Sequence, residues 1–108
     1  MNPTSESQQR AQNFIRWMIL RMLYACRPGT ASEEIVVRVL QNLDFDYALE
    51  DVRQALDYME SAGLAVIRRT VRNGQRARLT KLGVAVVEYS TPAPSGIGRP
   101  RRWRCPTK

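Results

Sequence analysis

The chain has 108 residues, a net charge of +7 and no histidine; 44% of its residues are apolar and 25% are charged. This length supports one small domain with a single core, and the composition is that of an ordinary globular protein. The missing histidine excludes Ser-His-Asp and Cys-His catalysis and every metal site that needs a histidine ligand. The basic balance favours an anionic partner, which points to nucleic acid, an acidic protein or a membrane surface.

Location is indicated by the cysteines and by the first third of the chain. Cys26 and Cys105 are far apart in sequence and do not form a disulfide framework, so we expect free thiols in the cytosol. The polar first 13 residues lack the pattern of a signal peptide, and the apolar stretch 14–26 is too short to cross a bilayer. We therefore expect a soluble cytoplasmic protein with no metal, no cofactor and no membrane partner.

Charge is unevenly distributed along the chain. Residues 32–63 contain eight acidic side chains and two arginines, whereas residues 64–83 contain five arginines, one lysine and no acid. A strongly basic segment thus follows directly on an acidic one, and the two are expected to present different surfaces.

A first helix is predicted from about Ser7 to about Cys26, after a flexible N-terminus of residues 1–7. Between residues 14 and 26 it is apolar almost all round, whereas a helix that covers one core needs only a stripe. One interpretation is that its second face meets another copy of the chain; the other is a central helix wrapped by the rest of the domain. The candidate dimer-interface residues are Phe14, Trp17, Met18, Arg21, Val86 and Tyr89.

Two further helices are predicted in the acidic segment. Thr30 and Glu33 fit a capping box at the start of the second helix. A short connector follows, in which Asp46 is placed to cap a third helix over about 48–62, and Gly63 supplies a left-handed stop. Two helices joined by so short a turn make a helix-turn-helix candidate.

The basic segment is predicted to form a hairpin. Two β-prone stretches, 64–71 and 75–80, flank Asn73-Gly74, the preferred sequence for a two-residue hairpin loop. This loop pairs residue 71 with 76, 70 with 77, 69 with 78 and 68 with 79. Leu64, Val66, Ala77 and Leu79 then face the core.

In this register Arg69, Arg76 and Arg78 share the opposite face of the hairpin. Like charges side by side across strands are destabilising, so an anion such as phosphate is expected to balance them. The alternatives are that these arginines pair with the acids of the second and third helices, or are simply solvated.

After the hairpin, Thr80 is expected to cap a fourth helix over about 81–89. Residues 91–108 are predicted to form a disordered Pro/Arg-rich tail, in which a flexible linker leads to a basic cluster with one aromatic residue. The cluster comprises Arg99, Arg101, Arg102, Trp103 and Arg104. Such a tail can lie on phosphates, with the tryptophan stacked on a base or held as an apolar anchor, or it can be a solvated end.

The folded domain is predicted to comprise residues 8–90. Over about residues 8–89 the order Leu56, Tyr58-Met59-Glu60, Gly63-Leu64, hairpin, Leu79-Thr80 and Gly83 resembles the winged-helix domains of the MarR, PadR and ArsR repressor families. The resemblance implies a mostly α fold with a small β-hairpin: a winged helix-turn-helix of three helices, a two-stranded wing and a C-terminal helix. In size and basic character the chain is also similar to small proteins of Mu-like phages and prophages. It has no metal-sensor cysteine pair of the ArsR kind.

In the families that the chain resembles, the third helix enters the major groove, the wing lies at the minor groove, and a dimer reads two half-sites. The positions implied to face the groove are Tyr47, Glu50, Asp51, Arg53, Gln54, Asp57 and Tyr58. Of these, Arg53 and Gln54 are suited to reading bases, while three carboxylates near phosphates weaken binding. The candidate wing contacts are Arg68, Arg69, Arg72, Arg76, Arg78 and Lys81.

Two functions follow as hypotheses. The first is a dimeric module that binds double-stranded DNA mainly through wing and tail, as a transcriptional regulator or phage DNA-transaction protein. The alternative is a phage-related protein-interaction adaptor that uses the acidic surface of the second and third helices. Catalysis is disfavoured, because acids at helix starts are usually caps and the sequence offers no nucleophile, base or phosphate loop.

Overall fold

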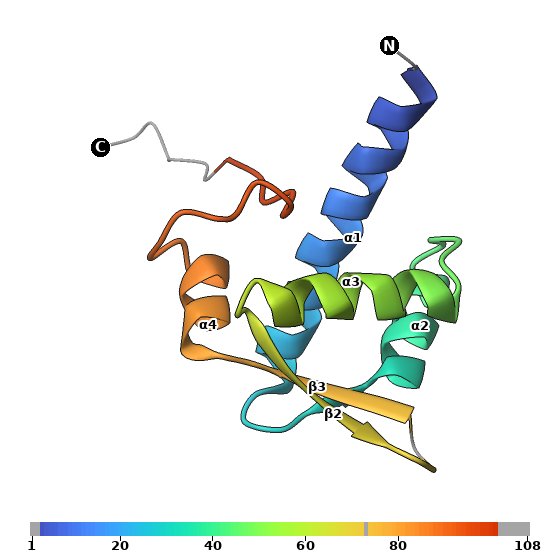
Figure 1. Ribbon diagram of the computed structural model, residues 1–108, viewed down its shortest axis with the longest axis vertical. Helices are drawn as coiled ribbons and strands as arrows, with labels where there is room; N and C mark the ends of the chain where they lie inside the picture. Colours follow the sequence, from blue (N-terminus) through green and yellow to red (C-terminus); the bar gives the residue numbers. More distant parts are fainter. Residues whose placement is uncertain (1–2, 73, 102–108) are drawn as a thin grey trace.

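The computed structural model describes residues 3–72 and 74–101 (Figure 1). This part of the chain forms a compact mixed α/β domain. Its helices are α1 (Pro3–Cys26), α2 (Glu33–Asn42), α3 (Leu49–Ser61) and α4 (Lys81–Val87), and its strands are β1 (Ala31–Ser32), β2 (Ala65–Thr70) and β3 (Gly74–Leu79). No helix among these residues is long and apolar enough to cross a membrane.

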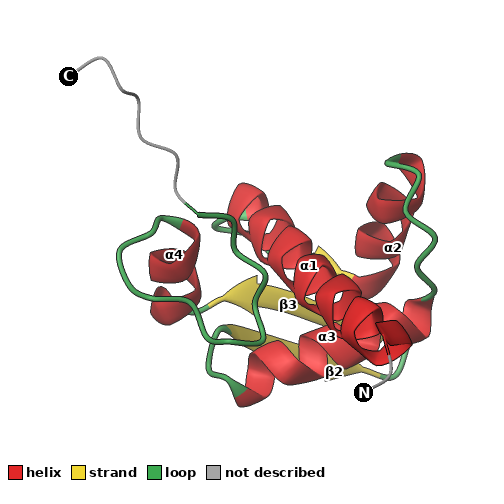
Figure 2. Cartoon of the chain, turned by 90° about the horizontal axis from the view of Figure 1, so that it is seen from above, coloured by secondary structure: helices red, strands yellow, loops and turns green. Residues whose placement is uncertain are grey.

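The strands form one antiparallel sheet in the order β1-β3-β2, with the helices gathered on one side of it (Figure 1). Seen from above, α1 crosses over the sheet, with α4 to one side and α2 to the other (Figure 2). The sequence predicted a hairpin of two strands only. Strand β1 was missed because its two residues are too few to show the alternation of a strand.

Helix α1 is the centre of the core. Its side chains Ile19, Leu20 and Leu23 are fully buried, and the helix contacts α3, α4, β1 and β3. The nearly continuous apolar surface is therefore covered by the protein's own elements on several sides. This arrangement matches the central-helix interpretation of its sequence.

The N-terminal half of α1 extends beyond the rest of the domain (Figure 1). The helix begins at Pro3 and not near Ser7, so residues 3–7 are helical where a flexible N-terminus was predicted. Residues 6–12 are all exposed. The start was misplaced because a polar helical stretch without an apolar stripe resembles a loop in sequence.

Capping agrees with the sequence at one helix and differs at two. Thr80 caps α4 as predicted, since its hydroxyl accepts a hydrogen bond from the Gly83 amide at 3.1 Å. Helix α2 is capped by Ser32 and not Thr30, because residues 31–32 pair with β3 and delay the start of the helix. Helix α3 uses the Asp51 carboxylate, which accepts a hydrogen bond from the Ala48 amide at 2.9 Å, in place of Asp46.

The hairpin has a different register from the predicted one. Thr70 pairs with Gly74, which has a φ of +67°, and not with Ala77. The shift is odd, so the side chains of β2 move to the opposite face, while those of β3 keep the faces that were predicted. The observed register places an all-apolar set against the helices, comprising Ala65, Ile67, Ala77 and Leu79, and leaves Val66 43% exposed. Burial of Ile67 favours this register over the one that a two-residue loop at Asn73-Gly74 would set.

Residues 91–101 pack back on α1, where a flexible linker was predicted. Ile97 is buried, and the Gly98 amide donates a hydrogen bond to the Asn13 carbonyl oxygen at 2.9 Å. At Gly96 an added Cβ would overlap the Tyr58 ring. Gly96, which lies in the predicted flexible linker, thus permits close packing, and composition alone does not distinguish this role from flexibility.

Candidate nucleic-acid interface

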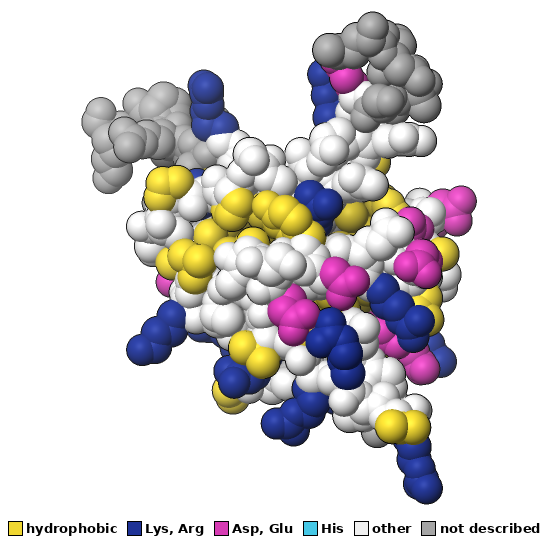
Figure 3. Space-filling model, viewed as in Figure 1, with side chains coloured by type: hydrophobic (Ala, Val, Ile, Leu, Met, Phe, Trp, Pro, Cys, Tyr) yellow, Lys and Arg dark blue, Asp and Glu magenta, His cyan; other side chains and the backbone are white. Residues whose placement is uncertain are grey.

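The outer face of the sheet, turned away from the helices, carries three arginines. Arg68 lies directly opposite Arg76 across β2 and β3, and Arg78 lies opposite Val66. We call Arg68, Arg76 and Arg78 the outer arginine cluster. With Val66 and Thr30 they line a hollow of about 180 Å³. Figure 3 shows basic side chains at this end of the molecule.

Among the described residues, no carboxylate forms an ion pair with the outer arginine cluster. Arg76 donates a hydrogen bond from Nε to the Thr30 hydroxyl oxygen at 2.9 Å, which ties β3 to the segment before α2. Arg68 and Arg78 are exposed. Because Arg68 and Arg76 are like charges facing each other, this surface is destabilised unless an anion lies over it.

Arg69 is the predicted outer-face residue that the register moves to the other side. Its guanidinium donates to the Glu60 carboxylate at 2.9 Å and lies 3.4 Å from the Asp57 carboxylate. The hydrogen bond from Arg69 lowers the pKa of Glu60. For this arginine the alternative reading, pairing with an acid of the third helix, is the one that the structure shows.

Arg53, a predicted base reader, forms a two-pronged ion pair with Glu33. Its Nε and one terminal nitrogen each donate to a Glu33 carboxylate oxygen at 2.9 Å. These hydrogen bonds lower the pKa of Glu33, and the backbone amide of Gln75 lowers it further. Glu33 is 3% exposed. It therefore joins α2, α3 and the hairpin at one point.

The role of Glu33 was missed in the sequence, where it fitted a capping box. Gly74 approaches its carboxylate so closely that an added Cβ would overlap it. Neither contact has a local sequence signal, because Arg53 and Gly74 are far from Glu33 along the chain.

The rest of the exposed α3 surface is acidic. Glu50, Asp51, Asp57 and Glu60 are exposed, together with Gln54. In Figure 3 the acidic side chains gather across the middle of the molecule, over α3 and toward α2. This surface would repel a phosphate backbone.

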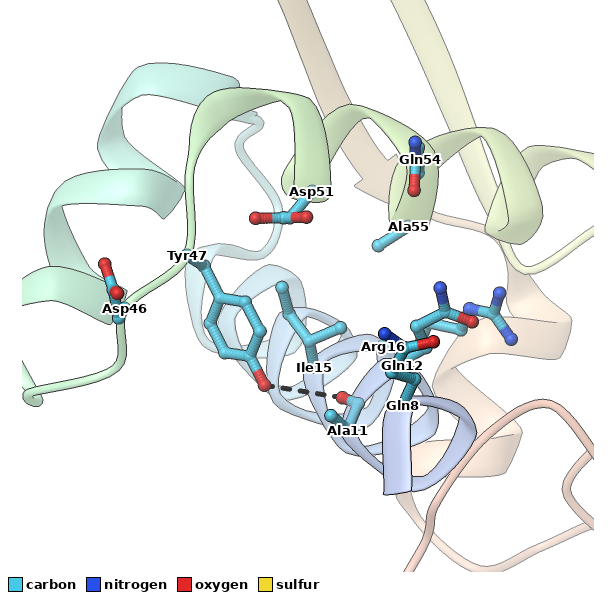
Figure 4. Close-up of a pocket in the computed structure, with 10 residues that line it drawn as sticks. All are labelled: Gln8, Ala11, Gln12, Ile15, Arg16, Asp46, Tyr47, Asp51, Gln54 and Ala55. Carbon is cyan, nitrogen blue, oxygen red and sulfur yellow. Dashed lines mark hydrogen bonds between the residues drawn. The ribbon is translucent and has the colours of Figure 1, made fainter. Parts of the chain in front are cut away.

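Another hollow, of about 430 Å³, lies between the projecting half of α1 and the start of α3 (Figure 4). Most of its lining is polar: Gln8, Gln12, Arg16, Asp46, Tyr47, Asp51 and Gln54. The Tyr47 hydroxyl donates to the Ala11 carbonyl oxygen at 3.4 Å, and Arg16 lies 4.0 Å from the centre of the Tyr58 ring. Three of the positions implied to face a groove, Tyr47, Asp51 and Gln54, therefore border α1.

The remaining residues predicted to contact DNA fall into three groups. Arg72, Lys81 and Arg101 are exposed. Arg99 is engaged within the domain, because it donates to the Val86 and Thr91 carbonyl oxygens at 2.9 Å each and stacks on the Tyr89 ring. The predicted contacts Arg102, Trp103 and Arg104 lie outside the described residues.

Two of the six predicted dimer-interface residues lie in the core of the protomer itself. Trp17 is 5% exposed and Val86 is fully buried, so neither offers surface to a second copy. The sequence misplaced them because a wrapped central helix and a dimerising helix show the same apolar pattern. Phe14 and Arg21 are exposed, while Met18 and Tyr89 are half-buried.

No group of three or more cysteine, aspartate or glutamate side chains among the described residues is placed to hold a metal ion. Cys26 is a free, exposed thiol. Comparison of the chain with protein-family models, with curated proteins and with solved structures finds no match.

Proposed function

We propose that the chain is a winged-helix protein that binds double-stranded DNA through the outer arginine cluster, as a transcriptional regulator or a phage-type DNA-transaction protein. The order α1-β1-α2-α3-β2-β3-α4 supports this proposal, since it is the order of a winged helix with its hairpin as the wing. The helical pair α2 and α3 supplies the helix-turn-helix.

One observation carries the proposal: the outer arginine cluster has no carboxylate partner in the described structure. Phosphate oxygens would form charge-assisted hydrogen bonds with these guanidiniums and relieve the repulsion between Arg68 and Arg76. Exposed Arg72 lies in the turn of the same hairpin, and exposed Lys81 begins the helix that follows it. Both add positive charge near the outer arginine cluster. Binding of this kind neutralises phosphates and therefore weakens steeply as salt rises.

Helix α3 contributes little base reading in this proposal. Arg53 is held by Glu33, and the exposed neighbours Glu50 and Asp57 carry negative charge. Contacts to phosphates position a protein on DNA without selecting a sequence. We therefore expect low sequence preference.

The test is fluorescence anisotropy of a labelled duplex of mixed sequence, titrated with the full chain across a salt series. Three proteins are compared: wild type, the double variant Arg68→Gln/Arg78→Gln, and the control Arg10→Gln/Arg38→Gln. All four positions are exposed, and both variants lose two charges. Weaker binding and a flatter salt dependence are expected for the first variant only. Equal binding by the two variants would overturn the proposal.

A second candidate is the protein-interaction adaptor. It is favoured by the exposed acids of α3 and by the polar hollow beside α1, which together suit a partner with basic side chains. A homodimer remains compatible with either function, with exposed Phe14 and Arg21 as its candidate contacts. Absence of duplex binding at low salt, with retention of a basic partner protein that Glu50→Gln/Asp57→Asn releases, would favour the adaptor.

A further inference from the structure

The turn that follows α1 lies beside the C-terminal end of β3. Ala31 pairs with Ala77 in antiparallel strands, so residues 27–30 run back along β3 toward the start of α4 (Figure 1). The hydrogen bond from Arg76 to the Thr30 hydroxyl oxygen, at 2.9 Å, holds this turn against the strand. Residues 27–30 are all exposed. Two segments that are distant in sequence therefore form one surface.

A further hollow lies where this turn meets the end of the hairpin, and we call it the turn hollow. Its volume is about 390 Å³, and its basic lining residues are Arg27, Arg78 and Lys81. All three are exposed, and none forms an ion pair with a carboxylate among the described residues. The Arg27 guanidinium lies over the Tyr24 ring, 4.3 Å from its centre, and the Tyr24 hydroxyl donates to Glu88 at 2.6 Å. The turn hollow thus gathers positive charge that the acids of the described structure do not pair.

The turn hollow continues the outer arginine cluster. Arg78 lines both the turn hollow and the hollow bounded by Arg68 and Arg76. Side chains on one face of a strand stand about 7 Å apart, and this is the spacing of Arg76 and Arg78 along β3. Each strand of a duplex carries one phosphate per about 3.4 Å of helix axis. A phosphate backbone that contacts the outer arginine cluster would therefore reach the turn hollow within a few nucleotides.

Acidic side chains are absent from the described lining of both hollows. The polar hollow between α1 and α3 differs, because Asp46 and Asp51 line it. Phosphates would meet no nearby carboxylate along the path from the outer arginine cluster to the turn hollow, so like-charge repulsion does not oppose this path.

We propose that the turn hollow is a second phosphate-binding site for the same duplex, in which Arg27 and Lys81 contact the backbone beyond the outer arginine cluster. The assignment rests on the proposed function and deepens it, because it gives the duplex a path from the sheet across the turn after α1. Arg27 becomes a DNA contact that belongs neither to the helix-turn-helix nor to the hairpin.

The test is anisotropy of a labelled duplex of mixed sequence with the full chain, across a salt series. Wild type is compared with Arg27→Gln, Lys81→Gln and the control Arg38→Gln, each of which removes one exposed charge. The first two variants should each weaken binding by about threefold and lower the slope of log affinity against log salt by about 1. The control should stay close to wild type. Arg27→Lys keeps the charge and should keep the wild-type slope, and circular dichroism checks that all variants are folded.

The outcomes separate this assignment from the proposed function. Binding by Arg27→Gln at the level of the Arg38→Gln control would overturn the turn hollow as a site, and the proposed function would stand if Arg68→Gln/Arg78→Gln still weakens binding. An equal loss of slope in Arg27→Lys and Arg27→Gln would also overturn it, because Arg27 would then act by packing on Tyr24 and not by its charge. Absence of duplex binding by wild type would overturn both.

Discussion

The arginines on the outer face of the sheet differ from those beside α3 in whether they are paired with carboxylates. Arg53 and Arg69 point toward helices and are satisfied by Glu33, Asp57 and Glu60. The outer arginine cluster has no such partners among the described residues. Net charge therefore does not identify a binding surface in this protein. The pairing of each arginine distinguishes those that hold the fold from those that are free to meet an anion.

The largest expected effect is a loss of stability at the Glu33–Arg53 pair, where the hairpin is joined to α2 and α3. Replacement of Glu33 by Ala leaves Arg53 without its partner and removes the acceptor for the Gln75 amide, which should cost about 2–3 kcal/mol in the free energy of unfolding. Urea denaturation measures this change. The control is exposed Glu34→Ala, expected to stay within about 0.5 kcal/mol of wild type. Equal losses in the two variants would show that the Glu33–Arg53 pair does not hold the hairpin to the helices.

The next effect concerns DNA. Loss of Arg68 and Arg78 to Gln should weaken duplex binding by about tenfold and lower the slope of log affinity against log salt by about 2, because two phosphate contacts are removed. Arg76 is kept in this variant, so its hydrogen bond to Thr30 is preserved. Anisotropy titrations at several salt concentrations measure both quantities. An unchanged slope would mean that DNA, if bound, lies elsewhere.

The Glu33–Arg53 pair also predicts a dependence of stability on pH. The pKa of Glu33 is lower in the folded protein than its ordinary value of 4.5. Its contribution is therefore complete above that value and is lost as the pH falls through the folded-state pKa. Between about pH 6 and about pH 3, wild type should lose more stability than Glu33→Gln. Parallel curves for the two proteins in urea denaturation would contradict this assignment.

The smallest effect on duplex affinity is expected at Arg69, the sequence neighbour of Arg68. Arg69→Gln should change duplex affinity by less than about twofold, because Arg69 is already paired with Glu60 and Asp57. Only a slight loss of stability is expected, since these partners are exposed. Anisotropy and urea denaturation measure the two responses. A loss of affinity as large as that of Arg68→Gln alone would reverse the roles that the register assigns to these two arginines.

Much of the local structure follows from the sequence. The three longer helices, the left-handed conformation at Gly63 and the Thr80 cap have short-range causes, namely periodic apolar residues and single side chains that satisfy nearby amides. The contrast between the acidic helical segment and the basic hairpin is likewise a property of the sequence.

Tertiary structure alone decided which arginines are free. The register depends on burial of Ile67 against the helices, and its odd shift exchanges Arg68 for Arg69 on the outer face. Tertiary structure likewise decided the packing of segment 91–101 and the pairing of Glu33 with Arg53. These features join residues distant in the chain, and their energies depend on the surfaces that meet after folding. The sequence determined that a basic hairpin follows two acidic helices; packing determined which of its charges remain available.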